Sequence, residues 1–446
     1  MADARRTLDE GWLEEASAAL REANIAFADA HPGEGAGRQP VHSVYGGAQL
    51  FSYDTAVKVG RVAQQSMDLF APDAAALGAA LGILDHPALA MIDERVRGKL
   101  AREAVEDYRI DFEDGYGNRP DTEEDGHCGI VVGELLKGIE QQTLPPFIGI
   151  RIKPLNEEMR SRSVRTLDLV MTGLVNGGGI PAGWVITVPK ITIVEQVIYM
   201  VYVLGELEDK LGLDAGSLQF EAMVETPQLV LDAAGTSLLP RLVDAADGRL
   251  SAAHFGTYDY TAGTNITAAY QRMQHPACEF AKQVMQVALA GTGVWLSDGS
   301  TTVLPVPLHK GDSLTDEQRT ENIRSVHAAW KMHFDDVRHS LAGGFYQGWD
   351  LHPAQLVSRY GALYSFFLEG IEAAGARLKN FVQKAAQATL VGDVFDDAAT
   401  GQGLLNFFLR GINSGAITEA EALTMTGLTA EEFRGRSFVK IMQGRK

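Results

Sequence analysis

The chain has 446 residues, of which 46% are hydrophobic, and its 39 basic and 58 acidic side chains give a net charge of −19. The length exceeds one typical domain of roughly 100–200 residues, and the acidic balance argues against nucleic acid or an anionic membrane as a partner. Two cysteines, Cys128 and Cys278, are too few for a disulfide framework and suit a reducing compartment. No apolar run reaches the ~20 residues of a membrane span, and the charged N-terminus has no signal-peptide core, so we expect a cytoplasmic protein.

Predicted helices and strands alternate along most of the chain. Apolar residues at helical spacing predict an amphipathic helix over 7–30, and the Gly- and Pro-containing segment 31–40 ends it. Eight short apolar runs predict strands over 41–51, 108–115, 147–154, 184–191, 218–227, 250–261, 293–300 and 346–353. Intervening helices are predicted over 55–70, 129–141, 158–175, from 192 to about 211, 227–235, 264–290 and 316–341.

Eight strands alternating with helices is the number that a (β/α)8 TIM-type barrel requires. A doubly wound open sheet is the competing architecture, but it usually carries a Gly-rich phosphate turn after its first strand. The first strand here is followed by GGAQLF, which lacks the G-x-G-x-x-G spacing. The sequence therefore favours the barrel.

Three domains follow from this reading: an N-terminal helical extension over 1–40, a barrel over 41–355 and a C-terminal helical cap over 356–446. In the cap, helices are predicted over 358–385 and 400–413, and Thr418 and Thr429 are predicted helix N-caps. Aromatic pairs at 366–367 and 407–408 are core residues or part of a subunit interface.

Two carboxylates end neighbouring predicted strands. Glu225 closes LQFEAMVETP, and Asp259 closes LSAAHFGTYDYT. In a barrel the βα loops that carry chemistry open at the carboxyl ends of the strands. Mg²⁺ is held by few protein carboxylates and keeps positions for water or substrate oxygens, so this pair predicts a metal site; helix capping or ion pairing is the alternative.

Further charged residues are predicted at the same edge. Alternation places Asp111 and Glu113 of DFED on one face of the second strand, and Arg151 and Lys153 of GIRIKP on one face of the third. A basic residue in so apolar a strand is seldom buried unless it is paired, so the acidic pair is the expected partner of Arg151. Polar anchoring of a loop is the alternative for the carboxylates.

Lys190 ends the fourth predicted strand in VPKI. A Schiff-base lysine there would make the protein a metal-independent aldolase. The acidic residues that converge on the same edge favour a metal mechanism, so Lys190 is predicted to be a structural or phosphate-type contact.

Six short motifs in this order, DFEDG, GIRIKP, VPKI, VETP, GTYDYT and DLHPAQL, resemble the HpcH/HpaI aldolase and citrate lyase β-subunit superfamily, which also includes malate synthase-like enzymes. The resemblance spans residues 42–360. It implies a (β/α)8 barrel with Mg²⁺, or Mn²⁺, on Glu225 and Asp259, and Arg151 as the arginine that polarises the oxo group. Asp111 and Glu113 match the acidic pair of the second strand.

The resemblance further implies a carbon–carbon lyase that acts through the enolate of a 2-oxoacid, with a 2-oxoacid or hydroxyacid as substrate and a homo-oligomeric assembly. An acyl-coenzyme A substrate is an open alternative, because YGGAQLF stands where citrate lyase-like members have an LFVPG-like turn. His352 follows the HP-x-Q pattern and is expected at the rim, as a structural residue or a substrate contact.

Two points depart from the family pattern. An inserted LLPRLVDAADGR lengthens the connection between the two metal carboxylates, and the proton-transferring base has no assigned position. Its candidates in the cap are the acidic residues of GDVFDD, namely Asp393, Asp396 and Asp397. Two other functions remain open: phosphoenolpyruvate- or pyruvate-type phosphoryl, C–P or C–O chemistry on a related barrel, for which Lys153 and Lys190 would supply the cations, and a barrel subunit without catalysis.

Overall fold

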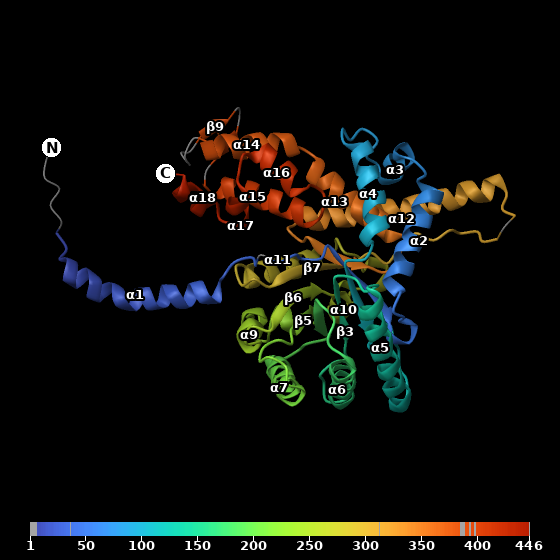
Figure 1. The fold of residues 1–446 in the computed structure, drawn as a ribbon, viewed down its shortest axis with the longest axis horizontal. Coiled ribbons are helices and arrows are strands. Elements are labelled where there is room, and N and C mark those ends of the chain that lie inside the picture. The colour runs from blue at the N-terminus through green and yellow to red at the C-terminus, as the bar shows by residue number, and fades with distance from the viewer. Residues whose placement is uncertain are drawn as a thin grey trace.

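The protein folds as a closed barrel of eight parallel strands in chain order, β1 to β8, as seen in the computed structural model (Figure 1). The structure describes residues 7–35, 37–311, 313–383, 389–391, 394–396 and 398–445. The barrel strands are β1 (His42–Gly47), β2 (Asp107–Asp111), β3 (Phe147–Arg151), β4 (Trp184–Val188), β5 (Phe220–Val224), β6 (Leu250–Phe255), β7 (Trp295–Ser300) and β8 (Gln347–Asp350). The expected TIM-type barrel is confirmed.

Helices follow the strands on the outside of the barrel, as crossover connections between parallel strands require. Figure 1 shows α5, α6 and α7 on one side of the barrel, and α4, α12 and α13 on the opposite side. The helices between β1 and β8 are α2 (Thr55–Phe70), α3 (Ala74–Leu81), α4 (Leu89–Glu103), α5 (Asp121–Gln141), α6 (Arg160–Gly177), α7 (Val194–Leu211), α8 (Pro227–Val230), α9 (Leu239–Ala245), α10 (Thr257–Gly263), α11 (Pro276–Leu289) and α12 (Asp316–Ala342), with 3-10 turns η1 (Ala48–Leu50) and η2 (Ala268–Tyr270).

Several predicted helices are shorter than their apolar pattern suggested. The helix expected over 227–235 is only α8, and the helix expected over 264–290 begins at α11, because Pro276 supplies the first helical position. The strand predicted to end near Asp259 ends at Phe255, and Asp259 lies in α10. Helices α3 and α4, between the first two strands, were not predicted.

The chain after β8 is helical, as expected. Its elements are α13 (Gln355–Leu368), α14 (Ile371–Gln383), a hairpin of β9 (Thr389–Val391) and β10 (Val394–Asp396), α15 (Ala398–Asn413), α16 (Glu419–Thr426), α17 (Ala430–Arg434) and α18 (Phe438–Gly444). The single helix expected over 358–385 is divided at Gly370, whose φ of +70° a helix cannot accommodate. Thr418 and Thr429 cap α16 and α17, as predicted.

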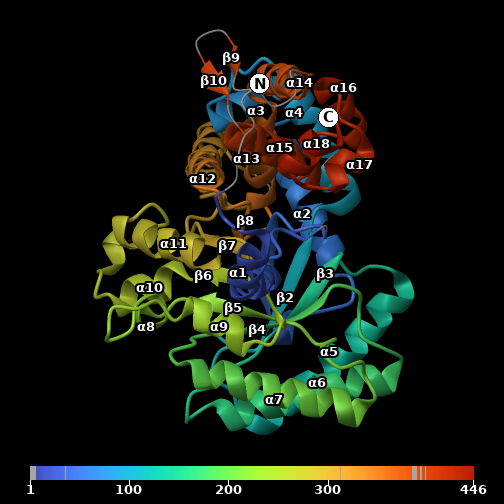
Figure 2. The same ribbon diagram turned by 90° about the vertical axis from the view of Figure 1, so that its left-hand side faces the viewer.

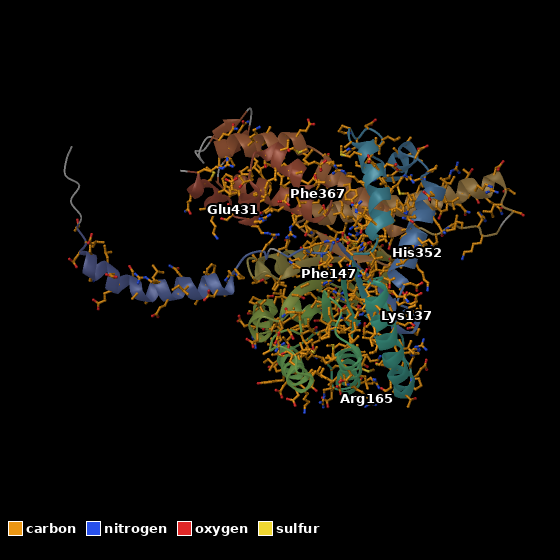
Figure 3. The ribbon with its side chains drawn as sticks, in the orientation of Figure 1. Lys137, Phe147, Arg165, His352, Phe367 and Glu431 are labelled. Atoms are coloured by element: carbon orange, nitrogen blue, oxygen red, sulfur yellow. The ribbon has the colours of Figure 1, made fainter. Side chains whose placement is uncertain are left out.

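The C-terminal helices share the layer above the barrel with α3 and α4 (Figures 1 and 2). Helix α13 is buried along almost its whole length. In α13 and α15, Phe367 and Phe408 are fully buried, so these two aromatic residues are core; Phe367 is labelled in Figure 3.

The N-terminal helix α1 (Glu10–Ala30) projects away from the barrel, and none of its residues is buried (Figure 1). None of the helices in the described part of the chain has the length and apolar character that a bilayer span requires.

Candidate active site at the carboxyl-terminal end of the barrel

An arginine–aspartate pair joins the ends of β2 and β3. Asp111 and Arg151 are partners in the strand register, and Arg151 donates from Nε and Nη2 to the two Asp111 oxygens at 2.7 and 2.5 Å. Arg151 Nη1 lies 3.3 Å from an oxygen of Glu113. Burial alone would lower the pKa of Arg151, but the charge and hydrogen bonds of Asp111, together with the charge of Glu113, raise it. The predicted pairing of Arg151 with the acidic group of the second strand therefore forms.

Lys190 extends this charged group toward β5 and β6. Its ammonium donates to Glu113 at 2.6 Å and to Asp114 at 3.0 Å, and it lies 3.5 Å from the carboxylate of Asp259. Lys190 adopts a φ of +50°, which is uncommon for a residue with a Cβ. Burial would lower its pKa, but the charge of Glu225 and the bond to Glu113 raise it. A Schiff-base lysine needs a lowered pKa, so the raised pKa of Lys190 does not favour that role.

Glu225 follows β5 directly and is only 2% exposed. One of its oxygens accepts from the backbone N–H of Lys190 at 2.7 Å. Burial raises the pKa of Glu225 to about 8, because the charge of Lys190 does not fully offset it and Asp259 adds repulsion. Asp259 itself is partly exposed on α10.

Glu225 and Asp259 suit a divalent cation. A Cβ atom at Gly256 would lie 2.6 Å from an oxygen of Glu225, so only glycine leaves room for that carboxylate group. Burial is the main cause of the raised pKa of Glu225, and the charges of Lys190 and Arg151 offset it only in part. Among the residues that the structure describes, no three His, Cys, Asp or Glu side chains converge as ligands of one ion. A site of two carboxylates, completed by oxygens of water or substrate, fits the way Mg²⁺ is held.

A family model described as "Domain of unknown function (DUF6986)" matches residues 20–441. The chain belongs to this family. No curated protein matches the sequence.

The DUF6986 chain shares its fold with a citrate lyase from Burkholderia xenovorans LB400, at 18% identity and a TM-score of 0.56, over 87% of this chain and 97% of that one. Haloferax volcanii malate synthase in its magnesium/glyoxylate complex aligns at 14% identity and a TM-score of 0.47, over 91% and 97% of the two chains. The citrate lyase β subunit of M. tuberculosis, complexed with oxaloacetate and magnesium, aligns at 12% identity and a TM-score of 0.38, over 73% and 98%. The structural similarity expected from the six motifs is confirmed at the level of fold, by the citrate lyase of Burkholderia xenovorans.

Two aromatic residues absent from the predicted site lie beneath Arg151 in the DUF6986 barrel. The rings of Tyr45 and Trp349 stack at 4.3 Å, and the guanidinium of Arg151 lies 5.0 Å from the first and 5.9 Å from the second. The Tyr45 hydroxyl is buried without a hydrogen-bond partner in the structure. Tyr45 lies in β1 and Trp349 in β8, so these neighbouring strands form an aromatic floor under the charged group.

A second charged layer, also missed, fills the barrel below this floor. Arg109 donates from Nε and Nη2 to the two oxygens of Glu221 at 2.8 Å each. Thr187 donates to the same carboxylate at 2.5 Å, and His254 Nε2 lies 3.0 Å from it. These residues come from β2, β5, β4 and β6, so their contacts cross the barrel interior.

Lys153 and His352 lie outside the charged group. The ammonium of Lys153 bonds to the Glu124 carboxylate at 2.7 Å and to the Phe112 carbonyl at 2.6 Å. His352 accepts from the backbone N–H of Ala354 through Nδ1 at 3.2 Å, at the start of α13 (Figure 3). Both side chains are held by contacts within the protein, and a role in substrate binding stays a prediction for each. In the cap, Asp393, Asp397 and the side chain of Asp396 lie outside the described part of the chain.

Proposed function

We propose that the protein is a Mg²⁺-dependent carbon–carbon lyase that forms or cleaves a bond next to the oxo group of a 2-oxoacid, through its enolate. The observation that carries the proposal is the placement of Glu225, a carboxylate only 2% exposed that accepts from the backbone N–H of Lys190 at 2.7 Å, while the ammonium of the same lysine lies 3.5 Å from Asp259. Perturbed carboxylates in a cleft with charged neighbours are typical of catalytic sites. The fold shared with a citrate lyase supports this class.

Glu225 and Asp259 would hold the metal ion. When bound, Mg²⁺ supplies Lewis-acid stabilisation of the negative charge that develops on the substrate oxygens. Mn²⁺, which prefers similar oxygen ligands, is an alternative ion.

Arg151 contributes a fixed positive charge next to the same oxygens. Its hydrogen bonds to Asp111 use two of its N–H donors, and Nη1 lies 3.3 Å from Glu113; a guanidinium carries further donors that remain for substrate. Because Asp111 holds it in bidentate fashion, its charge is oriented before substrate binds, which is the condition for strong stabilisation of a developing oxyanion.

Asp111 and Glu113 act as positioning residues. Asp111 accepts from Arg151 and also from the backbone N–H groups of Glu113 and Gly115, at 2.9 and 2.7 Å. Glu113 bridges Arg151 and Lys190. Together they fix the two cations at the mouth of the barrel.

The contacts of Lys153 weigh against phosphoryl-transfer chemistry as the alternative function. That chemistry needs several cations at the barrel mouth, and Lys153 is bonded to Glu124 instead. Of the two lysines expected there, only Lys190 lies in the charged group.

The proposal is tested by proton NMR of pyruvate and of oxaloacetate in D₂O with the purified protein. Formation of an enolate exchanges the protons on the carbon beside the oxo group for deuterium. We expect exchange with Mg²⁺ present and a fall of at least about 100-fold for Asp259→Asn, which keeps the size of the side chain but removes its charge. Exchange at the full rate in this variant, or neither exchange nor cleavage with the folded wild-type protein, contradicts the proposal.

A further inference from the structure

Helix α1 is an amphipathic helix whose apolar face is left uncovered by the part of the chain that the structure describes. It has 21 residues, it projects into solvent, and none of its residues is buried (Figure 1). The side chains of Trp12, Leu20 and Phe27 are each more than half exposed. Most of the stability of a helix in a protein comes from packing of its apolar face. This face therefore lacks the surface that would stabilise it.

The chain that follows α1 is fixed to the rest of the protein. The backbone N–H of Gly33 donates to the carbonyl of Gly291 at 2.8 Å. The backbone N–H of Gln39 donates to the side-chain oxygen of Asn413 at 3.0 Å. The body of the molecule is thus attached at the carboxyl-terminal end of α1, and the helix extends away from that body toward its amino-terminal end (Figure 1).

A heptad pattern with large and small side chains in alternation runs along α1. Apolar residues separated alternately by three and four positions form the seam of a coiled coil. In α1 this series consists of three large residues, Leu13, Leu20 and Phe27, which alternate with three alanines, Ala16, Ala23 and Ala30. The alanines of the seam are all exposed.

The alternation is self-complementary in an antiparallel pair of helices. Two copies of α1 related by a twofold axis between Arg21 and Glu22 bring each large residue of one copy opposite an alanine of the other. The resulting layers are Leu13 with Ala30, Leu20 with Ala23, and Phe27 with Ala16. A parallel pair would place two large residues in one layer and two alanines in the next, and two helices at one interaxial distance cannot pack both kinds of layer closely.

The position of the body and the charges of α1 favour the same arrangement. Since the body is attached at one end of the helix (Figure 1), an antiparallel pair separates the two bodies, whereas a parallel pair crowds them at one end. The charged residues between 11 and 30 lie off the seam, at Glu14, Glu15, Arg21, Glu22 and Asp29. Four carboxylates and one arginine make this polar face acidic, unlike the basic polar face of helices that bind membranes.

We propose that α1 is a dimerisation arm that pairs in antiparallel orientation with α1 of a second copy of this chain. A helix of 21 residues gives a contact about 30 Å long. The exposed rings of Trp12 and Phe27 each have roughly 100 Å² left to bury. With the leucines and alanines of the seam, two copies reach on the order of 1,000 Å², the area that a specific interface requires. This interface is independent of the proposed catalytic function.

The test is sedimentation equilibrium of the full-length protein at roughly 0.15 M salt, where charges more than about 8 Å apart are screened. The wild-type protein is expected to have the mass of two chains. Leu20→Glu places a carboxylate from each copy against an alanine without a partner, and is expected to raise the Kd of the dimer at least about 100-fold.

The matched control is Ile25→Glu. Ile25 is 56% exposed and Leu20 is 62% exposed, both on α1, but Ile25 lies off the seam. The variant adds the same charge to the same helix, and its Kd is expected to stay within about threefold of wild type. Because both positions lie outside the barrel, both variants are expected to keep the wild-type melting temperature.

The orientation of the pair is measured with spin labels on Glu14→Cys, a position off the seam. The two native cysteines, Cys128 and Cys278, are buried and leave the new thiol as the labelled one. An antiparallel pair separates the two labels by about 22 Å along the helix axis, whereas in a parallel pair only the interaxial distance of about 8–10 Å and the label arms separate them. A monomeric wild-type protein, equal weakening in the two glutamate variants, no weakening in Leu20→Glu, or the short label distance overturns the proposal.

Discussion

Two glutamates four residues apart, one in β5 and one directly after it, experience opposite electrostatic environments. Glu221 in β5 and Glu225 directly after it are each 2% exposed. Burial would raise the pKa of both carboxyl groups. In Glu221 the charges of Arg109 and His254 outweigh burial and hold the pKa well below its ordinary value, whereas in Glu225 the pKa is raised to about 8.

The two carboxylates are equally buried, and they differ in how much positive charge lies next to each of them. Glu221 accepts from Arg109 and Thr187 and lies beside His254, so its charge is matched within the protein. Among the described residues, the carboxylate of Glu225 accepts one hydrogen bond, from the backbone N–H of Lys190. A buried charge that is fully paired stabilises the structure only through its partners, while one left short of positive charge can bind a cation. The lower layer is therefore structural, and the upper layer is the candidate site.

The largest expected effect comes from breaking the lower layer. Arg109 also pairs with the buried carboxylate of Asp107 in β2. Replacing Arg109 by Met leaves Asp107 and Glu221 buried without their common cation, and we expect a loss of about 3–5 kcal/mol in the free energy of unfolding. Equilibrium denaturation in urea measures this loss. A decrease of less than about 1 kcal/mol would show that the paired charges of the lower layer do not have the structural role assigned to them.

In the upper layer, Arg151→Lys should act on catalysis more than on folding. Lysine keeps the charge but cannot make the bidentate contact with Asp111. We expect kcat for deuterium exchange to fall about 100-fold, equivalent to roughly 3 kcal/mol in the barrier, with a smaller change in KM. An unchanged kcat would remove Arg151 from the reaction.

Glu225→Gln should stabilise the metal-free protein at alkaline pH. Because the pKa of Glu225 is raised from 4.5 to about 8 in the folded state, the folded protein keeps a proton that the unfolded chain has lost, so wild-type stability falls as pH rises from 5 to 8. The glutamine side chain does not ionise, so the variant does not lose stability in this way and should be more stable than wild type at pH 8 by on the order of 1–3 kcal/mol. Denaturation curves at pH 5, 6, 7 and 8 compare the two proteins, and lower stability of the variant at pH 8 would contradict the proposed environment of Glu225.

The smallest effect is expected at the aromatic floor. Tyr45→Phe removes a hydroxyl that has no hydrogen-bond partner among the residues that the structure describes and keeps the stacking on Trp349, so the free energy of unfolding should change by less than about 0.5 kcal/mol. The exchange rate should stay within about twofold of wild type. A loss above about 1 kcal/mol in denaturation would mean that the hydroxyl has a role in the folded protein.

The sequence predicted the barrel and the positions of most strands because each strand is a short apolar run bounded by helical segments. It also predicted the pairing of Arg151 with Asp111. The lower layer could have been found by the same alternation: Arg109 stands two residues before Asp111, and Glu221 four residues before Glu225, on the same faces of their strands.

Other features depended on where strands end in three dimensions. Alternation put Lys153 on the face of Arg151, but β3 ends at Arg151, and beyond it the chain turns Lys153 toward Glu124. Glu113 also lies beyond its strand, yet the turn stabilised by Asp111 brings it back to Arg151. Such turns depend on side-chain hydrogen bonds that periodicity does not reveal.

The most direct test of the central claim is calorimetric titration of oxalate, a planar mimic of a pyruvate enolate, into the wild-type protein and Glu225→Gln, with and without Mg²⁺. The account predicts that oxalate binds the wild-type protein only with Mg²⁺ present and that the variant binds it under neither condition. Binding that is independent of Mg²⁺, or equal in the two proteins, would contradict a metal–enolate site at Glu225.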